Sequence, residues 1–210
     1  RQDEASDVLT LATQVRDSML NSYSGNLDLD IRNSYGATGG LDWYLDHFDA
    51  GNLDKVTMIC GRNRDVNWWN SAIRERLGMA DYFLNVGDAI VTQATCIEKG
   101  GFMQFKGSFG TIISISTEIK KYAGLHFVDA EVCFISNGHE KIIQTKILLE
   151  SIYTNSGKLS LKQESLLFAE VMKHNPDFRE SKNPWDDEYI GALRIRHAYA
   201  ITCHKAQGGE

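Results

Sequence analysis

Hydrophobic residues recur at helical spacing in three stretches of the first eighty positions. Their spacing predicts amphipathic helices over about 5–21, 41–48 and 66–77. Between the last two, an apolar run at 55–60 stops at Gly61, which predicts a short buried strand. A helix, a strand and a helix in quick succession are typical of a parallel α/β sheet.

The pattern changes after about residue 80, where short runs rich in Ile, Val, Phe and Thr follow one another. Glycines separate these runs, and Asn137-Gly138 is a strong signal for a hairpin turn. Regularly spaced short strands of this kind predict a small antiparallel β-barrel. The expected strands are 87–91, 102–105, 110–116, 126–135 and 141–149.

A helix and a polar connection follow these strands. Ser160 and Gln163 form a capping box, which predicts the start of a helix that ends near Lys173. The segment 175–188 contains two Asn-Pro pairs and five acidic residues, and we expect it to be an exposed linker. Partial alternation of apolar and polar residues over 193–201 predicts a return to a strand of the α/β sheet.

The two changes of pattern predict two domains. The first is discontinuous and comprises residues 1–78 plus 190–210. The second, residues 79–189, is inserted into the first and contains the barrel, one helix and the acidic linker. A chain of 210 residues is long enough for one large domain or two small ones.

Composition narrows the class of protein. Hydrophobic content of 42% and charged content of 24% are those of an ordinary globular protein. No apolar run approaches the roughly 20 residues needed to span a bilayer, so we expect no membrane partner. The four cysteines are scattered singly, which excludes a zinc-ribbon spacing and predicts reduced thiols in a cytoplasmic protein.

The net charge of −6 does not favour a nucleic-acid partner, because neutralisation of phosphates dominates such binding. The charge is uneven, however, with an acidic stretch in the first fifty residues and two basic clusters. A protein that follows a nucleic-acid strand needs a basic channel rather than a basic surface throughout. The clusters comprise Arg62, Arg64, Arg74 and Arg76, and Arg194, Arg196 and Lys205 with two histidines.

The last twelve residues, 199–210, form the most informative string of the chain. A strand that ends in Thr202 presents a hydroxyl and a backbone N–H at its tip, and both suit a phosphate oxygen. His204 and Lys205 add a donor and a positive charge, and Gly208-Gly209 lets the backbone approach a ligand closely. The alternative is a buried strand followed by an ordinary glycine turn.

This string, Tyr-Ala-Ile-Thr-Cys-His-Lys-Ala-Gln-Gly-Gly-Glu, resembles motif V of superfamily 1 helicases of the RecD-like branch. The resemblance implies that Thr202, His204 and Lys205 bind DNA. It also implies that Gln207, Gly208 and Glu210 face the ATP cleft. By the same resemblance, the opening Arg1 is the motif IV arginine, a catalytic and ATP-binding residue that touches the γ-phosphate.

The resemblance implies a fold as well. It is a RecA-like parallel-sheet domain of the P-loop NTPase type, a second motor domain without the P-loop. A small antiparallel β-barrel of the Src-homology type interrupts it. The segment 87–91 fits the family's first barrel motif, although the Asn that should follow is missing. The segment 106–112 fits the second motif more loosely, with Lys106 in place of Asn.

A second group of polar residues surrounds the turn that precedes the predicted helix of 66–77. Arg62 and Asn63 lie where a helix N-terminus attracts anions, and Asn67 follows one turn later. RecD-like helicases usually carry Thr-Asn or Arg-Asn here, so the resemblance implies that these three residues contact DNA. A capped helix with solvated asparagines is the alternative. Trp68 lies off the apolar stripe and either stacks on a base or is partly buried against the barrel.

Several elements of phosphoryl transfer are missing from the sequence. It contains no Gly-x-x-x-x-Gly-Lys-[Ser/Thr] string and no Asp-Glu pair at the tip of a predicted strand. The arginine-bearing motif VI of the family would lie beyond Glu210. Since the phosphate loop, the magnesium ligands and this arginine are central to the reaction, we expect the chain alone to be inactive.

We therefore expect part of an ATP-dependent DNA helicase or translocase, of the kind related to DNA repair and exodeoxyribonucleases. ATP and Mg²⁺ would be bound in the full-length protein and not by this chain alone. The expected partners are single-stranded DNA and the N-terminal RecA-like motor domain of the same polypeptide. The alternative is a non-catalytic module with a RecA-like fold that binds nucleic acid or protein.

Overall fold

A computed structural model describes residues 16–17, 37–48, 56–80, 82–97, 103–104, 106–136, 139–154 and 158–206. The chain divides into two compact units, 1–40 and 41–210. In the first unit, Arg16 and Asp17 are helical, and the remainder of the predicted helix over 5–21 lies outside the described residues. The predicted division at residues 78 and 190 stays a prediction, and the fold below is that of the second unit.

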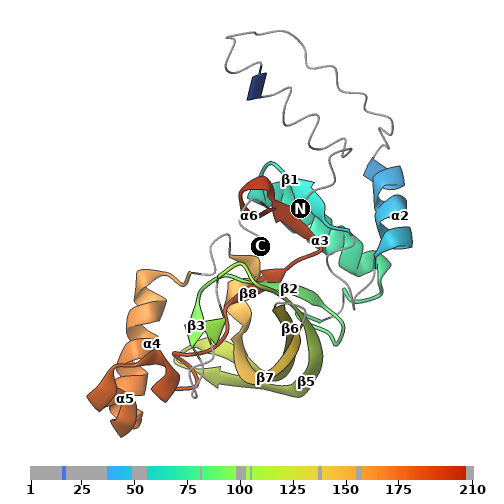
Figure 1. The fold of residues 1–210 in the computed structure, drawn as a ribbon. Helices are drawn as coiled ribbons and strands as arrows, with labels where there is room; N and C mark the ends of the chain where they lie inside the picture. Colours follow the sequence, from blue (N-terminus) through green and yellow to red (C-terminus); the bar gives the residue numbers. More distant parts are fainter. Residues whose placement is uncertain are drawn as a thin grey trace. The chain divides into compact units, whose positions relative to one another are not determined.

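A two-stranded parallel sheet joins segments far apart in the sequence. Strand β1 (Met58–Cys60) pairs with β9 (Ala200–Thr202), with Met58 opposite Ala200 and Cys60 opposite Thr202. Helix α3 (Asn63–Arg76) follows β1 directly and buries Val66 and Ile73. The predicted strand over 193–201 therefore joins this sheet only at its end, because Ile195–His197 forms β8 of the antiparallel sheet. Figure 1 shows β1 and α3 beside the C-terminal α6.

Helix α2 (Ala37–His47) lies where the second helix was predicted. Leu41 and Tyr44 are buried on one of its faces, and both belong to a hydrophobic cluster with Ile73 of α3 and Tyr199. Burial raises the pKa of the Tyr44 phenol well above its ordinary value. The apolar spacing of this helix thus marked the residues that pack beside the parallel sheet.

A separate antiparallel sheet contains five strands in the order β7-β6-β5-β2-β8. Its long strands form where the sequence predicted them, and β6 and β7 are neighbours on either side of Asn137-Gly138. A further pair of very short strands, β3 and β4, forms its own two-stranded sheet. The bounds are β2 Ala89–Thr92, β3 Cys96–Ile97, β4 Met103–Gln104, β5 Phe109–Tyr122, β6 Leu125–Ser136, β7 His139–Leu148 and β8 Ile195–His197.

The predicted barrel does not close. Leu193, just before the edge strand β8, forms one isolated parallel bridge with Ile147 of the other edge strand β7. Its N–H donates to the Lys146 carbonyl at 2.7 Å, and its carbonyl accepts from the Leu148 N–H at 3.1 Å. Because β8 is only three residues long, no ladder between the edge strands is found in the described part of the chain. The sheet is therefore open, and a single bridge joins its edges.

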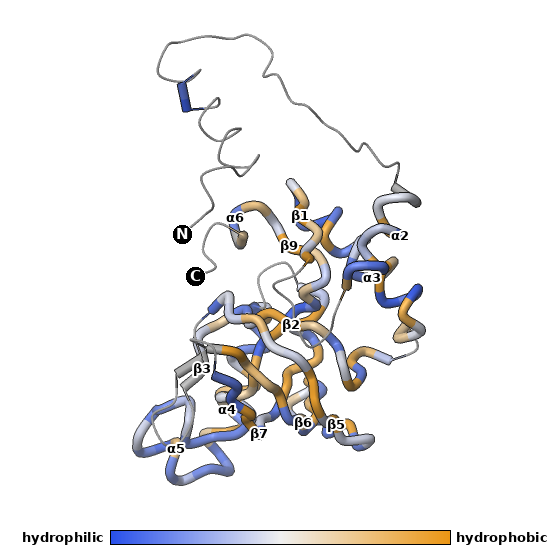
Figure 2. Tube along the Cα trace, turned by 45° about the vertical axis from the view of Figure 1, so that its right-hand side comes forward, coloured by the Kyte–Doolittle hydropathy of each residue, from blue (hydrophilic) through white to orange (hydrophobic). Residues whose placement is uncertain are grey.

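The inner face of this sheet holds the largest hydrophobic core. Ile90, Ile112, Val132, Ile147 and Ile195 come from its five strands and are almost completely buried. Figure 2 shows long hydrophobic stretches along the strands of this sheet, whereas α5 is mostly hydrophilic. Burying such side chains contributes roughly 1.5–3 kcal/mol each. This core fixes the position of β8, which leads directly into β9.

Two helices cover one end of the sheet through a second hydrophobic cluster. Helix α4 (Leu161–His174) begins with the predicted capping box, since Ser160 accepts from the Gln163 N–H and Gln163 accepts from the Ser160 N–H. Its Leu167 and Val171 pack with Phe127 of the sheet. A short 3₁₀ turn, η1 (Leu149–Tyr153), connects β7 to this region.

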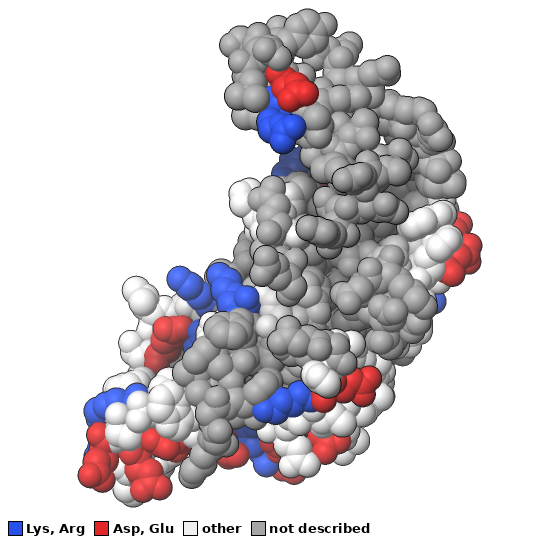
Figure 3. Space-filling view, viewed as in Figure 1, with Lys and Arg blue, Asp and Glu red and all other residues white. Residues whose placement is uncertain are grey.

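The segment 175–188 is largely exposed, as predicted, and it contains two short helical elements that the sequence analysis did not predict. Pro176–Ser181 forms helix α5 and Pro184–Asp186 forms the 3₁₀ turn η2. Asn175 caps α5 by accepting from the Phe178 N–H, and Phe178 is fully buried. The acidic composition concealed an N-cap followed by proline at the first helical position, which starts a helix. Figure 3 shows the acidic and basic side chains that cover α4 and α5.

The chain passes from the antiparallel to the parallel sheet within two residues. His197 is the last residue of β8 and Ala200 the first of β9. Between them, the Ala198 N–H donates to the Ala89 carbonyl of β2 at 2.8 Å, and the Tyr199 carbonyl accepts from the Met58 N–H at 3.1 Å. The passage between the two sheets therefore lies at 198–199.

Candidate nucleic-acid interface at the end of the parallel sheet

Cys60 and Thr202 end the two parallel strands side by side. A helix begins directly after each strand, α3 at Asn63 and the four-residue α6 at Cys203. The carboxyl ends of parallel strands and the helix that follows are where open α/β sheets bind ligands. The N-terminus of α3, with 14 residues in the helix, carries partial positive charge and favours an anion.

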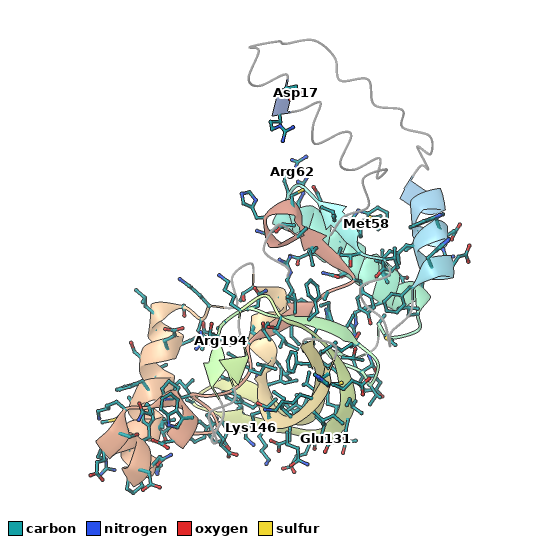
Figure 4. The ribbon with its side chains drawn as sticks, in the orientation of Figure 1. Asp17, Met58, Arg62, Glu131, Lys146 and Arg194 are labelled. Atoms are coloured by element: carbon teal, nitrogen blue, oxygen red, sulfur yellow. The ribbon has the colours of Figure 1, made fainter. Side chains whose placement is uncertain are left out.

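The first turn of α3 has exposed cationic side chains. Arg62 occupies the N-cap position in extended conformation and makes no side-chain cap bond. Its side chain, labelled in Figure 4, is exposed, and its Nε lies 3.4 Å from the Asp65 carboxylate. Arg64 is also exposed and lies near the same carboxylate. Both guanidinium groups can therefore reach an anion at this edge while Asp65 partly neutralises them.

Asn63 and Asn67, predicted to contact DNA, are engaged inside the protein. The Arg196 guanidinium donates through Nη1 to Asn63 Oδ1 at 2.9 Å and through Nη2 to the Asn63 carbonyl at 3.0 Å. The same Nη2 also donates to Asn67 Oδ1. Arg196 thus holds the first turn of α3 in place. Direct contact of either asparagine with DNA stays a prediction.

Arg196 itself is almost completely buried. Burial lowers the pKa of its guanidinium from the ordinary value, and nearby Cys60 opposes the shift. Among the described residues its Nε is one of the buried side-chain atoms that have no hydrogen-bond partner. A buried arginine on a short strand looks like a surface residue in the sequence, so the pattern gave no signal for this role.

The first basic cluster predicted from the sequence does not gather on one surface, and the second includes Lys205, whose side chain lies outside the described part. Arg74 is buried and pairs with Asp88, and Arg76 pairs with Asp42 at 2.7 Å. Only Arg62 and Arg64 of the first cluster remain exposed at the edge of the parallel sheet. Arg74 does not join Arg62 and Arg64 because it lies on the buried face of α3, where it pairs with Asp88.

Asn70 fixes β9 against α3. Its Oδ1 accepts from the Ala200 N–H at 2.8 Å. Its Nδ2 donates to the His197 carbonyl at 3.1 Å and to the Ala200 carbonyl at 3.3 Å. This buried amide bonds backbone groups on both sides of the 198–199 connection and so holds the start of β9 against α3. The sequence pattern did not reveal these contacts, because they join residues 127 and 130 positions apart.

A buried polar network lies beneath the edge. Asp88 accepts from Arg74 Nε at 2.9 Å, from the Tyr199 hydroxyl at 2.7 Å and from the Asn85 N–H at 2.7 Å. His197 Nε2 lies 3.9 Å from the same carboxylate. Burial lowers the pKa of His197 to about 4, although Asp88 opposes the shift. Burial and Asp88 both raise the pKa of Tyr199, which therefore remains a neutral donor.

The predicted motif V residues lie partly within the described chain. Thr202 is half-buried at the tip of β9, and His204 is exposed in α6. Lys205 belongs to α6, but its side chain lies outside the described part. Arg1, Gln207, Gly208 and Glu210 lie outside the described residues. The structure thus brings Arg62, Asn63 and Thr202 to one edge.

An aromatic side chain is also exposed on α3. Trp68 is 56% exposed and meets Trp69 edge-on, with ring centroids 4.8 Å apart. The Trp68 side chain is therefore only partly buried, and much of its ring faces solvent. An exposed indole in the second turn of α3 is suited to stacking on a base.

No protein-family model matches the chain, and no curated protein is similar to it at a significant level. Within the described ranges, no three His, Cys, Asp or Glu side chains are grouped so as to hold a metal ion. None of the helices in these ranges has the length and apolar character to cross a membrane. The geometry of the parallel-sheet edge therefore carries the functional argument.

Proposed function

We propose that this chain is the C-terminal motor part of an ATP-dependent DNA helicase or translocase. In this proposal the end of the parallel sheet, with Thr202 and the first turn of α3, holds the phosphate backbone of a single strand. The observation that supports it is the in-register pairing of Cys60 with Thr202. This pairing sets the motif V strand directly beside the helix that carries Arg62 and Arg64.

The chemistry of this edge suits a phosphodiester. Thr202 supplies a hydroxyl, α3 supplies the positive end of its dipole, and Arg62 and Arg64 supply exposed guanidinium groups. Trp68 adds a ring face for a base. A backbone contact combined with stacking binds single strands without reading their sequence, as a translocating protein requires.

ATP and Mg²⁺ belong to the full-length protein in this proposal. The resemblance of the C-terminal string to motif V implies that Gln207, Gly208 and Glu210 face a nucleotide held between two RecA-like domains. Arg1 would touch its γ-phosphate from the motif IV position. Movement of Thr202 relative to α3 would then couple the nucleotide state to the grip on DNA.

One observation favours the alternative, a nucleic-acid or protein-binding module without ATPase activity. Only two strands pair in parallel among the described residues, which is fewer than a RecA-like sheet contains. A module of this kind would use the same edge for binding but would require no second motor domain. The two functions share the binding site and differ in the response to ATP.

Binding of a fluorescently labelled oligothymidylate, followed by anisotropy, tests the proposed edge. Thr202→Val removes the hydroxyl at nearly constant volume, and Arg62→Gln and Arg64→Gln each remove one charge. Loss of a charge-assisted hydrogen bond costs roughly 1.5–3 kcal/mol, about ten- to a hundredfold in affinity. Each arginine variant should also lower the slope of log affinity against log salt by about one.

Lys162→Gln provides the matched control, because Lys162 is an exposed cation on the first turn of α4. It should leave the affinity and the salt slope of the wild type nearly unchanged. Equal effects of Lys162→Gln and Arg62→Gln would show that only overall charge matters. Wild-type affinity in all three edge variants would remove the basis of the proposal.

A further inference from the structure

Two cysteines that are far apart in the sequence meet at this edge. Cys60 ends β1, and Cys203 follows β9 directly as the first residue of α6. The Cys203 Sγ lies 3.5 Å from the Cys60 carbonyl oxygen, to which the thiol donates. Cys203 also stands inside the motif V string, between Thr202 and His204.

The strand register brings the two residues close together. Cys60 pairs with Thr202, and Cys203 comes directly after Thr202 at the start of α6. The Cys203 thiol reaches the Cys60 carbonyl and also acts electrostatically on the Cys60 thiol. A disulfide requires the Cys203 Sγ to move from this carbonyl to the Cys60 Sγ, with a Cα separation of about 4.4–6.8 Å.

The two thiols differ in accessibility. Cys60 is 7% exposed and packs with Val66 and Ala200, and burial raises the pKa of its thiol. Cys203 is exposed. A soluble oxidant therefore reaches Cys203 first, and Cys60 reacts afterwards from inside the protein. An exposed attacking thiol beside a buried resolving thiol is the arrangement of a redox-active pair.

We propose that Cys60 and Cys203 form a thiol–disulfide site that reacts with a small disulfide oxidant such as oxidised glutathione. The Cys203 thiolate attacks one sulfur of the oxidant and releases one glutathione thiolate. The Cys60 thiol gives up its proton to solvent, attacks the Cys203 Sγ and releases the second glutathione. The protein loses two hydrogens, and the oxidant is reduced to two thiols.

The disulfide changes the edge of the parallel sheet at which single-stranded DNA is proposed to bind. It ties the start of α6 to the end of β1 and moves the Cys203 side chain from its position over the Cys60 carbonyl. Thr202 directly precedes Cys203, and the first turn of α3 begins at Asn63, shortly after Cys60. We expect the oxidised protein to bind single-stranded DNA at least tenfold more weakly, and its affinity to recover with dithiothreitol. This expectation rests on the proposed function.

The disulfide itself is tested without any DNA. The full chain is incubated with oxidised glutathione, remaining thiols are alkylated, and the intact mass and tryptic peptides are measured. We expect the loss of two hydrogens, two fewer alkylated thiols, and a linked peptide pair containing Cys60 and Cys203. Cys60→Ser should instead accumulate glutathione on Cys203, whereas Cys203→Ser should remain unmodified at Cys60.

Cys133→Ser serves as the control, because Cys133 lies on β6 of the antiparallel sheet. This variant should form the Cys60–Cys203 disulfide at the wild-type rate. A linked peptide containing Cys133, or full alkylation of Cys60 after complete oxidant treatment, would overturn the proposal. Formation of the disulfide with unchanged DNA affinity would retain the thiol site and contradict the proposed strand contact instead.

Discussion

Arg196 on β8 donates to both the side-chain oxygen and the carbonyl of Asn63, the first residue of α3. The two residues are separated by 133 positions, and their contact links the antiparallel sheet to the helix that follows the parallel strand β1. The buried guanidinium thus determines how the first turn of α3 is presented. The first turn of α3 at the candidate site is therefore held by a residue of the antiparallel sheet.

Replacing Arg196 should affect stability and binding together. Arg196→Met keeps much of the side-chain volume but removes the bonds to Asn63 and Asn67, and we expect a loss of about 2 kcal/mol in unfolding free energy. Single-strand affinity should fall as well, because the first turn of α3 loses its support. Urea unfolding and anisotropy measure the two effects. Arg194→Met, which removes a partly exposed pair with Glu164, should cost less than about 1 kcal/mol.

The buried Arg74–Asp88 pair should be far more sensitive than an exposed pair of the same type. Asp88→Asn leaves the guanidinium of Arg74 without its carboxylate in a buried position, which costs about 3–5 kcal/mol. Asp42→Asn removes the exposed pair with Arg76 and should cost less than about 1 kcal/mol. Equal losses in urea unfolding would contradict the burial of this network.

Stability should depend on pH through His197. Its pKa is lowered to about 4 in the folded protein, below the ordinary value of 6.5, so the unfolded chain binds the proton more readily. The contribution of neutral His197 to the free energy of unfolding is therefore complete above pH 6.5, and it is lost as the pH falls towards 4. At pH 5 the loss is about 2 kcal/mol.

His197→Gln should flatten this part of the profile, because glutamine does not titrate and can still donate towards the Phe83 carbonyl. Asp88, Arg74 and Arg196 act on His197 in the wild type and remain in the variant. The measurement is the urea midpoint between pH 7 and pH 4.5 for both proteins. Parallel profiles would show that another group titrates.

ATP hydrolysis separates the motor from the binding module. The 210-residue chain alone should show no hydrolysis above background, because its sequence contains no phosphate loop. In a full-length protein with that loop, Thr202→Ala and Lys205→Ala should reduce DNA-stimulated hydrolysis more than basal hydrolysis. Stimulated turnover at the wild-type level in both variants would mean that motif V does not couple DNA to ATP here.

Local pattern was sufficient for much of the fold. The alternation and the Asn137-Gly138 turn placed the long hairpin of β6 and β7, and the capping box placed the start of α4. These features depend on residues close together in the sequence. The short helix α5 was missed because the acidic composition of 175–188 outweighed the Asn-Pro cap, which is equally local.

The supports of the candidate site could not be read in the same way. The motif string located Thr202, and the turn after β1 located Arg62. The contacts of Arg196 with Asn63 and of Arg74 with Asp88 depend on which strand neighbours which, and a charged residue carries no mark of burial in a single sequence. Asn70 is similar, since its partners are backbone groups 127 and 130 positions away.

Only Ala198 and Tyr199 separate β8 of the antiparallel sheet from β9 of the parallel sheet, and the backbone of each is bonded to a different sheet. A connection of two hydrogen-bonded residues cannot lengthen without breaking one of these bonds. A load on Thr202 along the axis of β9 is transmitted as tension into β8 and from there into β2, unless the hydrogen bonds of Ala198 or Tyr199 break first. The antiparallel sheet consequently acts as an anchor for whatever pulls on that strand.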